Sequence, residues 1–195
     1  PLCLVGSEMC IRDSLKIAYE NGKNIPSVVV YYAEKLRLND ETKRAKEVLQ
    51  IAILNRPCDK GLLESYANFC LTDQNPLESL KFNFRILLLF PNDSTGHTNI
   101  AEAYAALDNY EKSLEHQNIA IKYDTRSQVK LNRAITLLTL NQYQEGWAEY
   151  ENRLGDDIIS SPRRRLSVPR WNRQSLQNKT ILVCSEQGVG DELYF

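Results

Sequence analysis

Small side chains recur along this chain at a fixed step, with aromatic or other large residues just before or after them. A first series has a period of 34 residues, with one last step of 33, and comprises Ala33, Ala67, Ala101 and Ala134. A second series lies twelve residues further on in each unit and comprises Ala45, Ser79, Ser113 and Gly146. A period of this length is typical of a repeat architecture, in which each unit is one supersecondary structure stacked on the next.

The pattern predicts that each unit is a pair of antiparallel helices joined by a tight turn. Where two helices cross, small side chains let the axes approach to the short end of the ~8–10 Å range, which explains both series. Pro57 and Pro91 fall where a second helix has to end before the next unit begins. The predicted helices cover residues 27–39, 41–55, 61–72, 76–90, 95–107, 110–123, 128–140 and 143–153, after a partial helix around 14–21.

These positions resemble the tetratricopeptide repeat family over residues 25–155, most clearly in "NIAEAYAALDNYEKSLEHQNIAIKYD" at 99–124. The resemblance implies an all-α fold, a right-handed solenoid of helix–turn–helix pairs with about four repeats and a partial one in residues 15–155. Two positions depart from the family pattern, because Thr125 replaces a proline and His97 stands where an aromatic residue is common.

In such arrays the first helix of each pair lines a concave face, and that face is the binding surface. Helix phase predicts seven inward side chains, namely Glu34, Arg37, Glu64, Asn68, Asn99, Glu102 and Asn132. One interpretation is a solvated polar face. The other is recognition of a protein or peptide, since amide side chains can donate to and accept from a peptide backbone. Asn99 and Asn132 share one repeat position, which resembles the asparagine ladder in the repeat arm of O-linked N-acetylglucosaminyltransferases.

Composition changes this interpretation little. The chain has 195 residues, is 43% hydrophobic and carries 24 basic and 25 acidic residues, so its net charge of −1 predicts no broad nucleic-acid footprint. The five cysteines have no metal-ligand spacing, which favours reduced thiols in a cytoplasmic protein without a metal or other cofactor. No apolar run approaches the ~20 residues of a membrane span.

Both ends of the chain differ in character from the repeats. Residues 1–14, "PLCLVGSEMCIRDS", resemble a translated library adaptor, and the alternative is an ordinary N-terminal tail. Residues 156–179 are predicted to be a linker, in which Arg163, Arg164 and Arg165 either bind phosphate or remain solvated. Trp171 is expected to dock its ring on a neighbouring surface.

Residues 180–195 predict the start of an α/β domain. Ile181–Cys184 is an apolar run suited to a buried parallel strand, and Gly188 and Gly190 permit a tight turn near a ligand. Asp191 would then lie in the first turn of a helix, where its charge favours the positive end of the helix dipole. A dinucleotide-binding fingerprint would require a glycine at position 193, which is Leu193, so the sequence does not favour such a site.

Three segments in order, "YQEGWAEYENRL", "PRWNRQSL" and "NKTILVCSEQGVGDELYF", resemble a bacterial family in which tetratricopeptide repeats precede a two-domain (GT-B-type) glycosyltransferase. The resemblance covers residues 143–195 and departs from the family at Arg173, where glycine is common. It implies Asp191 as catalytic base, a substrate loop formed by Glu186, Gln187, Gly188 and Gly190, and a nucleotide sugar bound only by the full-length parent. The alternative role for Asp191 is a helix cap.

Two functional hypotheses follow. In the first, the chain is the protein-interaction arm of a glycosyltransferase, a fragment that lacks its catalytic nucleotide-binding domain and is itself inactive. In the second, it is a stand-alone repeat scaffold that binds protein partners without catalysis.

Overall fold

The computed structural model describes residues 16–155, 171 and 174–182. Residues 16–22 are helical, and four helix pairs follow. The pairs are α2 (Pro26–Leu38) with α3 (Thr42–Asn55), α4 (Lys60–Thr72) with α5 (Pro76–Leu89), α6 (Ser94–Ala105) with α7 (Tyr110–Tyr123), and α8 (Ser127–Thr139) with α9 (Tyr143–Tyr150). A 3-10 turn, η1 (Glu151–Leu154), continues α9. The predicted all-α class is confirmed, and the predicted helix bounds agree to within about two residues, apart from the last turn of α9.

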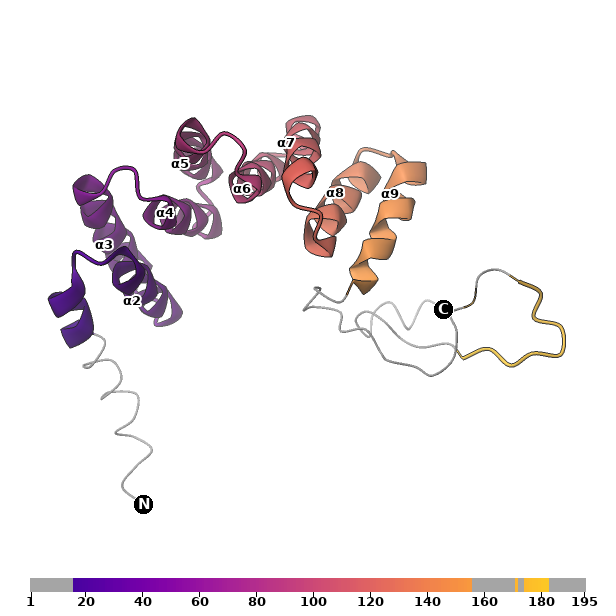
Figure 1. The fold of residues 1–195 in the computed structure, drawn as a ribbon, viewed down its shortest axis with the longest axis horizontal. Helices are drawn as coiled ribbons and strands as arrows, with labels where there is room; N and C mark the ends of the chain where they lie inside the picture. The colour runs from indigo at the N-terminus through magenta and orange to yellow at the C-terminus, as the bar shows by residue number, and fades with distance from the viewer. Residues whose placement is uncertain (1–15, 156–170, 172–173, 183–195) are drawn as a thin grey trace, which may run out of the picture.

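The helix pairs follow an arc, and the first helix of each pair lies on its inner side (Figure 1). Consecutive first helices approach one another, since α2 contacts α4 and α4 contacts α6. The second helices α3, α5 and α7 lie along the outer side (Figure 1). The first helices therefore form a continuous concave surface.

The two small-residue series lie where the prediction placed them. Every alanine of the first series is fully buried, and in the second series Ala45, Ser79 and Ser113 are at most 1% exposed. Gly146 shows the reason directly, because a Cβ atom there would lie 2.8 Å from Leu138 Cδ2 and 3.1 Å from Leu138 N. The helices of each pair cross so closely that only small side chains fit between them.

The turns between helices also repeat. α3 and α5 end at Asn55 and Leu89, two residues before Pro57 and Pro91, as predicted. Short polar side chains cap α4 to α7 by accepting a hydrogen bond from a backbone N–H of the first turn, at 2.8–3.3 Å. These caps are Asp59, Asn75, Asp93 and Asn109.

The turn inside each pair has one residue in the left-handed region, with φ between 54° and 62°. The four residues keep the repeat spacing and are Asp40, Gln74, Asp108 and Asn141. Asn and Asp tolerate this conformation better than other non-glycine residues, because their short polar side chains bond locally. No glycine marks these turns in the sequence, so this regularity was not predicted.

Ile181 and Leu182 are not in a strand and are 42% and 61% exposed. The rest of the predicted strand and of the α/β start lies outside the described residues, so the α/β start stays a prediction. The expected docking of the Trp171 ring is wrong, because Trp171 is half-exposed and its Nε1 donates to the carbonyl oxygen of Gln174 at 2.8 Å. The predictions for residues 1–14, for Arg163 to Arg165 and for 183–195 lie outside the described residues.

Candidate peptide-binding surface

Accessible side chains run across all four first helices at matching repeat positions. We call this set the inner stripe. It contains Tyr31, Glu34 and Leu38 on α2, Glu64, Asn68 and Thr72 on α4, Glu102 on α6, and Asn132, Ile135 and Thr139 on α8. Its members on α2, α4 and α6 are brought side by side because these helices pack against each other. On α8, Asn132 Nδ2 approaches Glu102 Oε1 of α6 at 3.4 Å, which connects the last part of the stripe to the rest.

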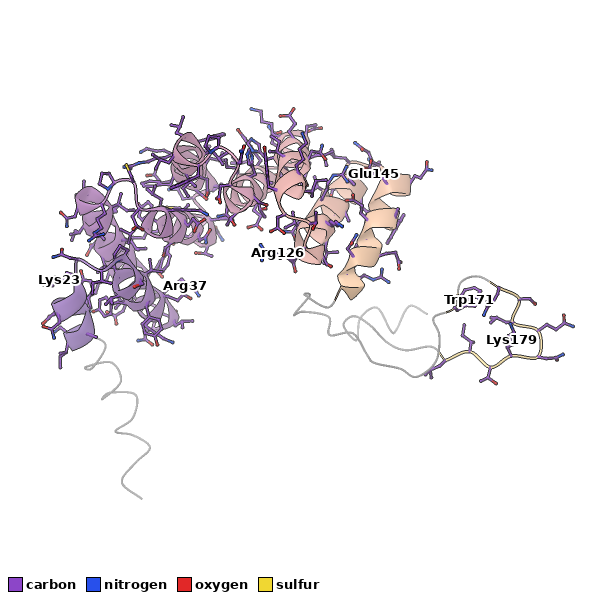
Figure 2. All side chains as sticks on the ribbon, viewed as in Figure 1. Lys23, Arg37, Arg126, Glu145, Trp171 and Lys179 are labelled. Carbon is purple, nitrogen blue, oxygen red and sulfur yellow. The ribbon has the colours of Figure 1, made fainter. Side chains whose placement is uncertain are left out.

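On α2 the predicted residues Glu34 and Arg37 form a bidentate ion pair. Arg37 Nη2 lies 2.5 Å from Glu34 Oε1, and Arg37 Nε donates to Glu34 Oε2 at 3.1 Å. This hydrogen bonding holds the pKa of the Glu34 carboxyl below its ordinary value. Arg37 lies on the inner side of the arc (Figure 2). The charges at this end of the surface are therefore internally balanced.

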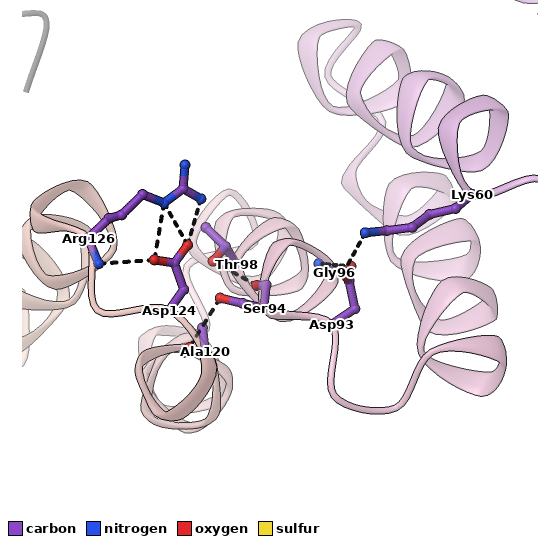
Figure 3. A network of polar contacts seen from close by, with 8 residues as sticks. All are labelled: Lys60, Asp93, Ser94, Gly96, Thr98, Ala120, Asp124 and Arg126. Atoms are coloured by element: carbon purple, nitrogen blue, oxygen red, sulfur yellow. Dashed lines mark hydrogen bonds and ion pairs between the residues drawn. The ribbon is translucent and has the colours of Figure 1, made fainter. Parts of the chain in front are cut away.

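On α4 the predicted Glu64 lies 3.3 Å from Lys60 Nζ, and Lys60 also pairs with Asp93 Oδ1 at 2.5 Å. Asp93 in turn accepts a hydrogen bond from the Gly96 N–H at 2.8 Å, so one carboxylate both caps α6 and ties it to α4 (Figure 3). The hydrogen bond to Asp93 is the main cause that raises the pKa of Lys60. Glu64 is therefore also paired within the chain.

On α6 and α8 the predicted Glu102 and Asn132 are brought together. Asn132 Nδ2 lies 3.4 Å from Glu102 Oε1, longer than an ordinary hydrogen bond, and Asn132 Oδ1 accepts from Gln128 Nε2 at 2.8 Å. Desolvation raises the pKa of the Glu102 carboxyl. Glu102 nevertheless keeps an accessible surface, so protein replaces only part of its hydration.

The two remaining asparagines differ in exposure. Asn68 is exposed, whereas Asn99 is only 8% exposed and its Nδ2 is covered without a hydrogen-bond partner among the described residues. Asn99 and Asn132 thus share a repeat position but not an environment. A peptide would reach the Asn99 amide only after that side chain rotates towards the surface.

The apolar members of the stripe were not predicted from the sequence. Tyr31, Leu38 and Ile135 are each more than half exposed. Helix phase could have found them, because Tyr31 and Leu38 lie one helical turn before and after Glu34, and Ile135 lies one turn after Asn132. They give the two ends of the surface an apolar character.

A second missed group is Arg126, which lies on the inner side of the arc just before α8 (Figure 2). Its guanidinium pairs with Asp124, with Nη2 2.6 Å from Oδ2 (Figure 3). The aspartate cancels this charge within the turn, so the pair adds no net cation to the surface.

Within the described ranges, no group of three or more His, Cys, Asp or Glu side chains is placed to hold a metal ion. No helix in the same part of the chain is long and apolar enough to cross a membrane. The predicted catalytic residue Asp191 and the loop Glu186, Gln187, Gly188 and Gly190 lie outside the described residues.

Comparison with known proteins supports the fold and leaves the function open. No family model matches the chain. Protein FlbA of Caulobacter vibrioides is 30% identical over 162 residues, which is 81% of this chain. The chain spans only 27% of the length of FlbA.

Solved structures with the same helix arrangement are more distant in sequence. TTC0263, a tetratricopeptide repeat protein of Thermus thermophilus, has a TM-score of 0.67 at 13% identity and covers 80% of this chain and 86% of its own. MamA from Desulfovibrio magneticus RS-1 has a TM-score of 0.63 at 16% identity, over 75% of this chain and 83% of its own. Human IFIT1 has a TM-score of 0.65 at 14% identity, over 74% of this chain and 36% of its own. The chain therefore has the tetratricopeptide repeat fold, as the spacing of its small residues predicts.

Proposed function

We propose that this chain is a protein-interaction module that holds an extended peptide segment of a partner protein along its inner stripe. The observation that carries this proposal is the set of accessible side chains at matching repeat positions on four consecutive first helices. Folded repeat arrays use such extended concave surfaces for binding. The mixture of amide, hydroxyl and apolar groups suits a peptide, which offers a polar backbone and apolar side chains together.

A selection of phage-displayed random peptides tests the proposal. We expect the chain to select peptides, and we expect Asn68→Trp to weaken their binding by at least about tenfold, because the indole would block the middle of the surface. The control is Lys43→Trp, which places the same side chain on an exposed position of the second helix α3. Failure to select any peptide, or equal loss in both variants, would contradict the proposal.

A second candidate is that this module is the arm of a glycosyltransferase. The order of the three segments within residues 143–195 supports it. In that protein Asp191 would act as base towards the acceptor hydroxyl, and Glu186, Gln187, Gly188 and Gly190 would form the substrate loop. Sequencing the gene through the codon of Phe195 tests this, because alternating strands and helices should follow. A stop codon there would favour the scaffold.

A further inference from the structure

The three carboxylates of the inner stripe differ in whether the chain itself neutralises them. Glu34 is paired with Arg37, and Glu64 is paired with Lys60. Glu102 has no ion-pair partner among the described residues, and its one polar contact is the long approach of the Asn132 amide. The centre of the surface therefore carries one uncompensated negative charge.

The electrostatic surroundings of Glu102 differ from those of the other two carboxylates. Protein that replaces water around a carboxylate disfavours its charged form, and the pKa of Glu102 is raised by desolvation with no charged neighbour opposing it. The Glu34 carboxyl occupies the same repeat position 68 residues earlier, and its pKa is lowered by Arg37. The same residue type on the same helix face thus has an ion-pair partner in one repeat and none among the described residues in the other.

The polar groups beside Glu102 are arranged as donors. Asn132 Nδ2 points to the carboxylate, and Gln128 holds the Asn132 side chain in that orientation. One turn before Glu102 on α6, the Asn99 amide is more than nine-tenths buried and lacks a hydrogen-bond partner among the described residues. A carbonyl of a bound peptide would supply this donor with a partner once Asn99 rotates outwards.

We infer that the peptide held by the inner stripe carries a cationic side chain, lysine or arginine, which pairs with Glu102. The inference rests on the proposed function. Binding of an ammonium or guanidinium group restores the charge compensation that the first two repeats supply internally. The apolar ends of the stripe at Leu38 and Ile135 then receive the apolar side chains that flank this cation.

The peptide selection above also tests this inference. Peptides selected on the natural chain should be enriched in lysine or arginine at one aligned position, and the enrichment should vanish when Glu102→Gln is the target. For a selected peptide, Glu102→Gln should weaken binding by about tenfold or more, as expected when one partner of a partly desolvated charge pair is removed. The control is Glu47→Gln, which makes the same change at an exposed carboxylate on the second helix α3, outside the inner stripe.

A double-mutant cycle separates a direct pair from a structural effect. Replacing the peptide cation by methionine should weaken binding to the natural chain but hardly affect binding to Glu102→Gln, because the two changes remove one interaction. Peptides that bind the inner stripe without a preferred cation would overturn this inference and leave the proposed function standing. The absence of any stripe-dependent peptide would overturn both.

Discussion

His97 and His116 bring two titratable rings into direct contact between α6 and α7. Their Nδ1 atoms lie 3.0 Å apart, and His97 Nε2 lies 3.3 Å from the carbonyl oxygen of Pro91. A carbonyl only accepts, so His97 Nε2 carries a proton, and in the neutral pair His116 Nδ1 donates to His97 Nδ1. The His116 ring also contacts Phe84 and Tyr104. Two positive charges cannot share this contact without repulsion.

This pair predicts a loss of stability in mild acid. Burial, followed by the charge of His97, lowers the pKa of His116 below 6.5, while Glu115 opposes the shift. The unfolded chain therefore binds protons before the folded chain does. The contribution of His116 to the free energy of unfolding is fully present above about pH 6.5. It is lost as the pH falls from there through the lowered pKa of the folded state.

Denaturant unfolding at several values between about pH 5 and pH 8 measures the effect. We expect the natural chain to lose more stability towards acid than His116→Phe, whose ring fits the aromatic surroundings and does not titrate. Both proteins keep the neighbouring charges of Lys112, which lies over the Tyr104 ring, and of Glu115. These charges therefore contribute equally to both stability curves. Parallel stability curves for the two proteins would contradict the prediction.

At the scale of helices, Gly146 and Gly61 should respond oppositely to alanine. Alanine normally stabilises a helix by about 0.5–1 kcal/mol relative to glycine. At Gly146 the added methyl would meet the side chain and backbone of Leu138 at 2.8–3.1 Å, so the pair α8 and α9 would have to separate. We expect Gly146→Ala to lower the free energy of unfolding by about 1–3 kcal/mol, as overpacked cores do.

Gly61→Ala is the matched control, because its methyl would meet only Asp59 Oδ1 at 3.5 Å, an ordinary contact. We expect a gain of up to about 1 kcal/mol there. Urea unfolding of both variants measures the two changes in the free energy of unfolding. Equal effects of the same sign would mean that helix propensity, rather than close crossing, determines where this array keeps its small residues.

At the scale of the whole molecule, the sequence predicts the array well because one constraint repeats. A close helix crossing needs a small residue at a fixed place in each unit, and this requirement is visible at Ala33, Ala67 and Ala101 without knowledge of the neighbours. Side-chain environments depend on the neighbouring helix as well. Asn99 and Asn132 occupy one repeat position, yet one is buried and the other accessible, and periodicity alone could not distinguish them.

Dependence on the neighbouring helix also explains why the most buried cation in the described part of the chain was not predicted. Arg133 is 9% exposed and bonds Asn118 on α7 and the carboxylates of Glu145 and Glu149 on α9. The repeat pattern does not predict a buried arginine here, because the other units have uncharged residues at this position, such as Ile100 and Tyr66. Burial works to lower the pKa of Arg133, and its hydrogen bonds to Glu145 and Glu149 outweigh this and raise it.

Because each unit of a repeat array contacts only its neighbours, loss of Arg133 should loosen one end and spare the other. Arg133→Ala removes the cation that joins α7 to the carboxylates of α9. Because the Glu145 side chain is half-exposed, the cost should stay below the about 3–5 kcal/mol of breaking a fully buried ion pair. We expect hydrogen exchange of α8 and α9 to accelerate strongly, while α3 and α4 keep the protection of the natural chain. Arg126→Ala, which removes an exposed arginine that pairs with the nearby Asp124, should change exchange little, since surface pairs contribute about 0–1 kcal/mol. Equal acceleration in all helices would show instead that the four pairs unfold as one cooperative body, and stability would then be a property of the whole arc rather than of adjoining units.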